Sequence, residues 1–182
     1  GSVAKLARIA EHAATVRFTA LLSLLTFLDA VVLAVALFAL TRAQDPDLAI
    51  LALCFRVCEG MIAAVAAIRT LGILDVAIAS TTAGPDAASA SALGASLLKQ
   101  GNSGTTVAAI CFALGSTVYC YLFLQARSVP VGLSWLGVFA SVLLVIALPL
   151  QLTGLLGGTM TTYVWMPMLF FEVPFALWLL IK

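Results

Sequence analysis

Charged side chains are scarce in this sequence. Lysine, arginine, aspartate and glutamate together make up 9% of the 182 residues, whereas an ordinary soluble domain contains about 25%. Hydrophobic residues make up 63%, and the mean hydropathy is +1.17. A water-soluble globule needs a polar surface, and the charged residues are too few to form one. The composition therefore excludes a soluble fold. It predicts a protein whose main partner is the lipid bilayer.

Basic clusters and metal-ligand patterns are also missing. Nine basic against eight acidic residues leave a formal net charge of +1, and no basic run occurs, so nucleic-acid binding has no support. His12 is the only histidine, and the four cysteines, at positions 54, 58, 111 and 120, lie in apolar stretches without zinc-ligand spacing. We therefore expect no metal, no disulfide and no cofactor.

Catalytic motifs are absent as well. The sequence contains no Ser/His motif, no paired-metal motif and no glycine-rich phosphate loop. An enzyme is therefore the least supported class of function, which leaves binding and structural roles.

Long apolar runs dominate the remaining sequence. Each is about 20 residues or more, which is enough for a helix to cross the bilayer. The segment 80–104 is instead rich in Ala, Ser, Thr and Gly, and we predict a polar loop with a short interfacial helix over 87–100. We predict an all-α, polytopic transmembrane bundle in which residues 1–182 form a single domain. Its five spans are residues 18–41, 48–74, 105–125, 131–152 and 163–181.

The break between the first two spans, residues 42–47, is short. It contains an aspartate in position to cap the following helix, and Pro46 suits a first helical turn. The first two spans should therefore form a tight antiparallel hairpin.

Lysine and arginine positions bear on the orientation of the chain. One membrane face carries Arg42, Arg127 and Lys182, and the other carries four basic residues, Lys5, Arg8, Arg17 and Lys99. A raw count slightly favours the second face as cytoplasmic. Charges in short loops beside span ends weigh more, however, and Arg42 and Arg127 fit that description better. We therefore expect a cytoplasmic C-terminus.

Four ionisable residues of the apolar spans fall near one depth: Asp29, Arg56, Glu59 and Glu172. Counting about 1.5 Å of rise per residue from the face that carries Arg42 places Asp29 about 20 Å deep. The same count places Arg56 and Glu59 at roughly 14 to 18 Å and Glu172 at about 15 Å. Because ionisable residues near the midplane are costly and usually functional, all four are candidate ligand- or ion-binding residues.

The charges of this layer do not balance. The i, i+3 spacing places Arg56 and Glu59 on one helix face, so they can pair with each other or together reach Asp29 and Glu172. Three acids then share one arginine. If all were ionised, the layer would carry a charge of about minus two, which a low-dielectric site resists. At least one carboxyl group should therefore stay protonated or find a cation.

Two roles for the layer stay open. The first is a polar intramembrane cavity that binds or moves a small solute, a proton or a cation. The second is a structural or interaction subunit, in which the charges only fix helix packing or contact a membrane-protein partner. Asp29 also has a purely structural explanation, since any two of Ser23, Thr26 and the Arg56 head group can donate hydrogen bonds to its carboxylate.

Three short stretches share an apolar character broken by a few charged residues and prolines. They are LALCFRVCE at 51–59, RSVP at 127–130 with Leu133 and Leu136-Gly137, and Pro167 with EVPFALWLLIK at 172–182. In these stretches the chain resembles the bacterial integral membrane family called domain of unknown function 4386. The likeness runs along most of the chain, whereas the segment from Ser80 matches poorly and the third span lacks a histidine found in many relatives.

The resemblance carries expectations of its own. Family members usually have one more span upstream, and this chain begins with Gly-Ser instead of Met, so the resemblance implies six spans in the full-length protein. It also implies a bacterial inner membrane location and a cytoplasmic C-terminus. It brings no biochemical activity.

Overall fold

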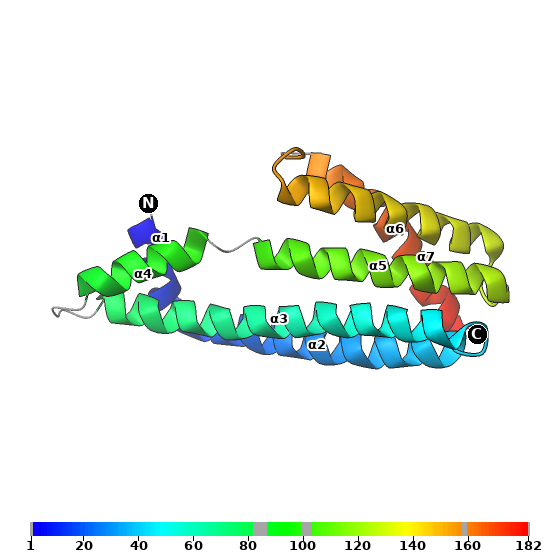
Figure 1. Cartoon of the computed structure of the whole chain (residues 1–182). Coiled ribbons are helices and arrows are strands. Elements are labelled where there is room, and N and C mark those ends of the chain that lie inside the picture. Colours follow the sequence, from blue (N-terminus) through cyan, green and yellow to red (C-terminus); the bar gives the residue numbers. More distant parts are fainter. Residues whose placement is uncertain (1, 82–86, 100–102, 158–159, 182) are drawn as a thin grey trace. The chain divides into compact units, whose positions relative to one another are not determined.

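The structure, a computed structural model, describes residues 2–81, 87–99, 103–157 and 160–181. Over these ranges the chain forms seven α-helices and no strand, which confirms the predicted all-α fold (Figure 1). The helices are α1 (Ser2–Glu11), α2 (Ala13–Thr41), α3 (Pro46–Thr81), α4 (Ala87–Lys99), α5 (Ser103–Ala126), α6 (Val131–Leu152) and α7 (Met160–Ile181).

Five of these helices are long and apolar enough to cross a membrane: α2, α3, α5, α6 and α7. They correspond to the five predicted spans, and two of their ends differ from the prediction by five residues or more. Helix α2 begins at Ala13 and α3 continues to Thr81, beyond the predicted limits at 18 and 74. Both extensions contain alanines among their polar residues, so the hydropathy falls there while the helix propensity persists.

The predicted polar loop at 80–104 contains helix α4, which confirms that a short helix forms there. Residues 82–86 and 100–102 of that loop lie outside the described residues. The interfacial position of α4 stays a prediction.

The start of α3 has the cap that the sequence predicts. The Oδ1 atom of Asp45 accepts hydrogen bonds from the backbone N–H groups of Asp47 at 3.1 Å and Leu48 at 3.0 Å. Pro46 occupies the first helical position, where its missing N–H leaves no carbonyl unpaired. These local contacts set the point at which α3 begins.

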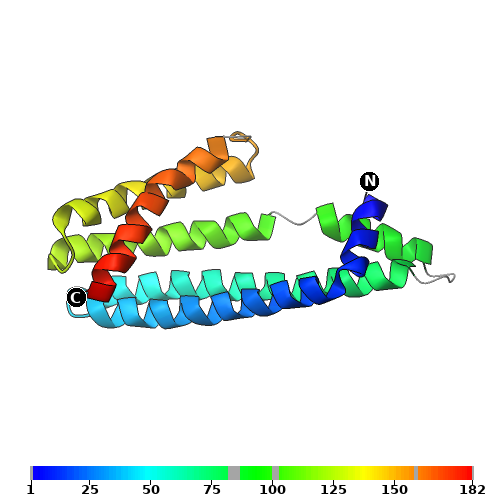
Figure 2. The same ribbon diagram turned by 180° about the vertical axis from the view of Figure 1, so that it is seen from behind.

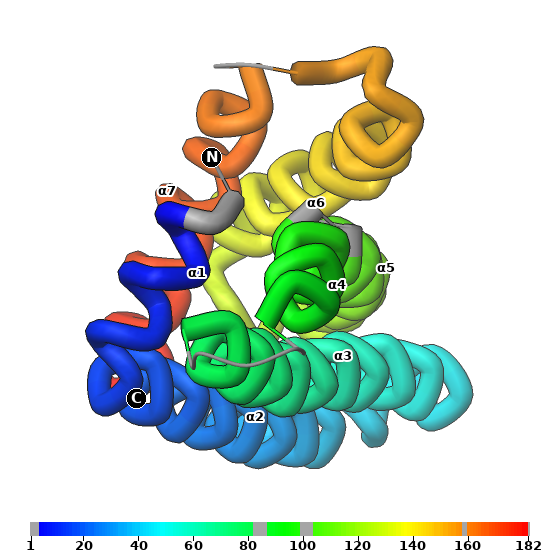
Figure 3. The backbone as a smooth tube through the Cα atoms, turned by 90° about the vertical axis from the view of Figure 1, so that its left-hand side faces the viewer, coloured from blue at the N-terminus to red at the C-terminus, as the bar shows by residue number. Residues whose placement is uncertain are grey.

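The chain divides into two compact units. Unit 1 consists of Gly1–Asp29 and Gly60–Thr105, and unit 2 of Ala30–Glu59 and Thr106–Lys182. Within unit 1, α1 packs against α4 (Figure 3). Arg69 of α3 donates a hydrogen bond to the backbone carbonyl of Leu97, which joins α3 to α4.

Unit 2 has its main apolar core where α5, α6 and α7 meet, and α6 packs directly against α7 (Figure 2). Gly137 of α6 permits this approach. A Cβ atom at this position would lie 2.6 Å from both Cys120 Sγ and Phe171 Cε2. Small residues let membrane helices pack closely, and here the space left by the glycine is filled by side chains of α5 and α7.

Replacing Gly137 by alanine should therefore force apart a packed core. We expect Gly137→Ala to lower the free energy of unfolding by about 1 to 3 kcal/mol, the usual cost of overpacking. Thermal unfolding of the detergent-solubilised protein measures this. Gly132→Ala is the matched control, because it lies in the same helix with no atom within 4 Å of the added Cβ. Equal loss in both variants would contradict the packing explanation.

Candidate functional site

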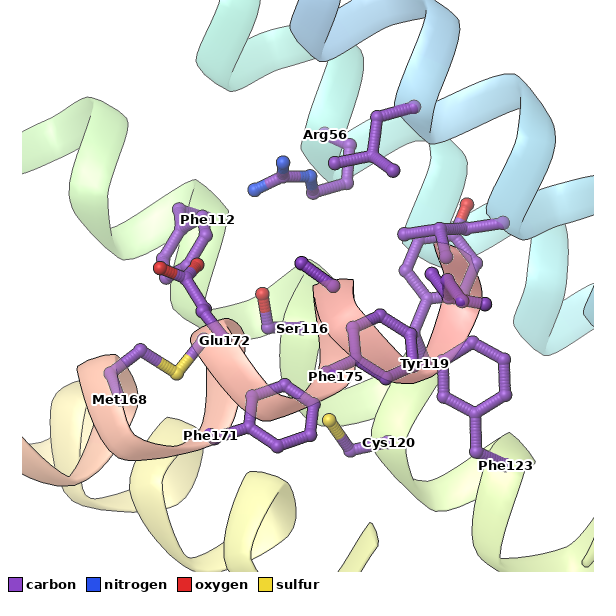
Figure 4. Close-up of a pocket in the computed structure, with 14 residues that line it drawn as sticks. Arg56, Phe112, Ser116, Tyr119, Cys120, Phe123, Met168, Phe171, Glu172 and Phe175 are labelled. Atoms are coloured by element: carbon purple, nitrogen blue, oxygen red, sulfur yellow. The ribbon is translucent and has the colours of Figure 1, made fainter. Parts of the chain in front are cut away.

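Unit 2 contains a cavity of about 180 Å³ that is bounded by α2, α3, α5 and α7 (Figure 4). An apolar cavity of about 150 Å³ already admits benzene, so this one has room for a small organic molecule. Most of the lining is apolar, with a few polar groups among the rings. The aromatic lining residues are Phe112, Tyr119, Phe123, Phe171 and Phe175.

Arg56 reaches the cavity from α3. Only 7% of the residue is exposed, which is unusual for an arginine. Its stem packs on α5 at Gly115, where an added Cβ would lie 3.1 Å from both Cγ and Cδ of the arginine. The glycine thus leaves the room that the arginine stem occupies, and it allows a long cationic side chain between two apolar helices.

The guanidinium group of Arg56 has two neighbours that stabilise its positive charge. Its Nη1 atom lies 2.7 Å from Glu59 Oε2, which is the i, i+3 ion pair that the sequence spacing allows. Its Cζ atom lies 4.8 Å from the centre of the Phe112 ring, a cation–π contact.

The hydrogen-bonding capacity of Arg56 is nevertheless unmet. Nη1 and Glu59 Oε2 are close but not aligned as a hydrogen bond, and Nε has no acceptor among the described residues. Unpaired donors in a buried position cost free energy, typically about 1 to 3 kcal/mol each. The site therefore offers donors to an acceptor that the protein itself does not supply.

Glu172 lines the same cavity from α7. Figure 4 shows its carboxylate beside Phe112, on the side of the cavity that the Arg56 guanidinium faces. The residue is exposed, and over the described part of the chain no lysine or arginine forms an ion pair with it. Because Arg56 is already paired with Glu59, the cavity wall has one carboxylate in excess.

Asp29, the remaining predicted site residue, belongs to unit 1, where it occupies an exposed position on α2. The hydroxyl groups of Ser23 and Thr26 do not donate hydrogen bonds to its carboxylate. Ser23 donates to the carbonyl of Thr19 at 3.0 Å, and Thr26 donates to that of Leu22 at 2.9 Å. The structure therefore brings Arg56, Glu59 and Glu172 together in unit 2, and a role for Asp29 stays a prediction.

The uncharged lining residues were not predicted. On α5 they recur at helical spacing, at positions 112, 116, 119, 120 and 123, which is a signal in principle. Because α5 is apolar on all sides, no face of the helix stands out in the sequence. Tyr119 is the most consequential of these residues, since its buried hydroxyl donates to the Ala34 carbonyl at 3.1 Å and ties α5 to α2.

Comparison with known proteins identifies the family of the chain. The family model called Domain of unknown function (DUF4386) matches residues 1–182, the whole chain. The chain belongs to the DUF4386 family. This result confirms the resemblance carried by the short stretches around Arg56, Pro130 and Glu172. No curated protein and no solved structure matches this DUF4386 protein.

The hydrogen bond from the Tyr119 hydroxyl should contribute to the stability of this DUF4386 protein. Tyr119→Phe removes the hydrogen bond to Ala34 and should lower the free energy of unfolding by about 1 kcal/mol. Tyr121→Phe is the control, because Tyr121 is exposed and its hydroxyl accepts a hydrogen bond from Gln125 Nε2 of the same helix at 2.8 Å. Denaturant unfolding in micelles compares the two. The prediction is wrong if both variants unfold like the wild type.

Proposed function

We propose that this DUF4386 protein is a non-enzymatic, multi-pass membrane protein that binds a small solute in the cavity beside Arg56. The observation that carries the proposal is a nine-tenths buried arginine whose Nε and Nη1 donors lack a hydrogen-bond acceptor among the described residues, at the wall of a cavity large enough for a ligand. Five apolar helices support the membrane setting.

The polar groups of the cavity favour a particular kind of solute. Arg56 calls for a hydrogen-bond acceptor, and a carboxylate suits the guanidinium fork best. Glu172, which shares the positive charge of Arg56 with Glu59, disfavours a simple anion and favours a hydrogen-bond donor or a positive charge. The aromatic rings accept an apolar body. A small zwitterion of the amino-acid type meets all three conditions.

A matched series of probes tests this proposal. Leucine carries both charges, 3-methylbutylamine only the positive one, and 4-methylpentanoate only the negative one, on the same branched skeleton. Thermal-shift titration of the detergent-solubilised protein should show the strongest stabilisation with leucine and the weakest with 4-methylpentanoate. Arg56→Gln should weaken leucine binding about tenfold or more, because a charge-assisted hydrogen bond contributes about 1.5 to 3 kcal/mol.

Arg42→Gln is the control for this series, since Arg42 is exposed and does not line the cavity. Binding of the anion as tight as that of leucine would contradict the assigned role of Glu172. An equal loss of leucine binding in Arg42→Gln and Arg56→Gln would contradict the role of Arg56.

The alternative function, a structural or interaction subunit, draws on a different observation. Asp29 is exposed on an apolar helix, and a carboxylate facing hydrocarbon calls for a protein partner. Glu59→Gln separates the two functions. Under the binding proposal the variant stays folded, because an amide oxygen at position 59 can accept a hydrogen bond from Arg56. Its leucine response changes, because the site has lost one negative charge. Loss of folded protein, with no response to any probe, would favour the structural role.

We also propose a bacterial inner membrane location with a cytoplasmic C-terminus. Arg42 directly follows the end of α2, and Arg127 directly follows the end of α5. Basic residues this close to span ends favour the cytoplasmic side. A green fluorescent protein fused after Lys182 should therefore fluoresce, and an alkaline phosphatase fused there should be inactive. The reverse pattern would invert the topology.

A further inference from the structure

Unit 1 contains an open cleft of about 430 Å³ that has a different chemistry. Three basic or titratable side chains line it: Lys5, Arg8 and His12. Its apolar lining includes Val16 of α2 and Leu98 of α4. No acidic residue of the described chain lines the cleft, so the electrostatic potential in it is positive.

The basic side chains lie on α1 and at His12, where the chain turns from α1 into α2 (Figure 2). The N–H of His12 donates to the Arg8 carbonyl at 3.2 Å, and the N–H of Val16 donates to the His12 carbonyl at 3.1 Å. Positions 5, 8 and 12 follow the three- and four-residue steps of one face of α1, and Val16 of α2 lines the same cleft. The His12 ring is held beside α1, since its Nδ1 atom lies 3.0 Å from the Arg8 carbonyl.

An apolar contact holds α1 in place on unit 1. Leu6 is 1% exposed and packs against Gly94 of α4, where an added Cβ would lie 2.8 Å from both terminal methyl groups of the leucine. The helix thus has a buried anchor and a separate charged stripe. An amphipathic helix that directly precedes a candidate span suits a position near the lipid phosphates. Helix α2, a candidate span, begins at Ala13, directly after the stripe of α1.

We propose that this cleft, formed by Lys5, Arg8 and His12 with Val16 and Leu98, binds the phosphate group of an anionic lipid. The basic side chains neutralise the phosphate, and the apolar lining receives the start of the lipid tail. A lipid fits better than free phosphate because the cleft is part apolar and lies beside a span. The inference concerns unit 1 and does not depend on the solute proposed for the Arg56 cavity.

The test uses the full chain in detergent. Short-chain phosphatidylglycerol and phosphatidylcholine are titrated and followed by native mass spectrometry, and inorganic phosphate is titrated by calorimetry. We expect phosphatidylglycerol to bind more tightly than phosphatidylcholine, and Arg8→Gln to weaken its binding about fivefold. Arg17→Gln is the matched control, because Arg17 is an exposed arginine nearby that does not line the cleft. It should leave the binding unchanged.

Three results would overturn the proposal. Equal binding of the two lipids by the wild type would show that the cleft does not recognise an anionic headgroup, and this comparison needs no variant to fold. Equal weakening in Arg8→Gln and Arg17→Gln would show a diffuse charge effect without a site. Binding of inorganic phosphate that depends on Arg8, without binding of phosphatidylglycerol, would assign the cleft to a soluble anion instead.

Discussion

A buried guanidinium group is the constraint on which unit 2 depends. A charge placed among apolar helices must be stabilised by the protein, and Arg56 obtains this from a carboxylate one turn along its own helix and from a ring of α5. Its stem needs space as well, which Gly115 supplies. Each of these features follows from holding one cation at depth, yet together they leave its Nε donor without a partner. Scaffolding alone would be served as well by an apolar residue of similar volume.

Aromatic rings give the cavity a defined wall. Phe175 stands between two neighbours, with ring centres 5.4 Å from Phe123 and 5.2 Å from Phe171, and Phe123 stacks with Tyr119 at 6.5 Å. Such pairs contribute about 0.5 to 1.5 kcal/mol each beyond the area they bury. Rings have few rotamers, so a wall built from them collapses into a void less readily than one built from flexible side chains. The series joins α5 to α7, the two helices that carry most of the lining.

The sequence predicted the helices well and the cavity only in part. Length and hydropathy are enough to find five spans, and the spacing of Arg56 and Glu59 is enough to predict their pairing. Depth counting also placed Glu172 at the level of Arg56, and the structure has both on one cavity. Counting residues gives the position of a side chain along the helix axis, however, but not the direction in which it points around that axis. Asp29 therefore looked equivalent to the others, although its side chain is exposed in unit 1. The aromatic lining escaped prediction because α5 and α7 are apolar all round.

The two proposed sites differ in how far their basic residues are buried, and burial changes what a basic side chain can bind. Near the surface, Lys5 and Arg8 remain exposed, so neither needs a partner and their positive potential is available to any anion. In the core, Arg56 is paired with Glu59, which reduces its net attraction for a simple anion. The cavity still offers hydrogen-bonding groups with a fixed direction. They are the unpaired N–H groups of Arg56 and, across from them, the Glu172 carboxylate. On these two proposals, the surface cleft selects ligands by charge, whereas the buried cavity selects them by the placement of donors and acceptors.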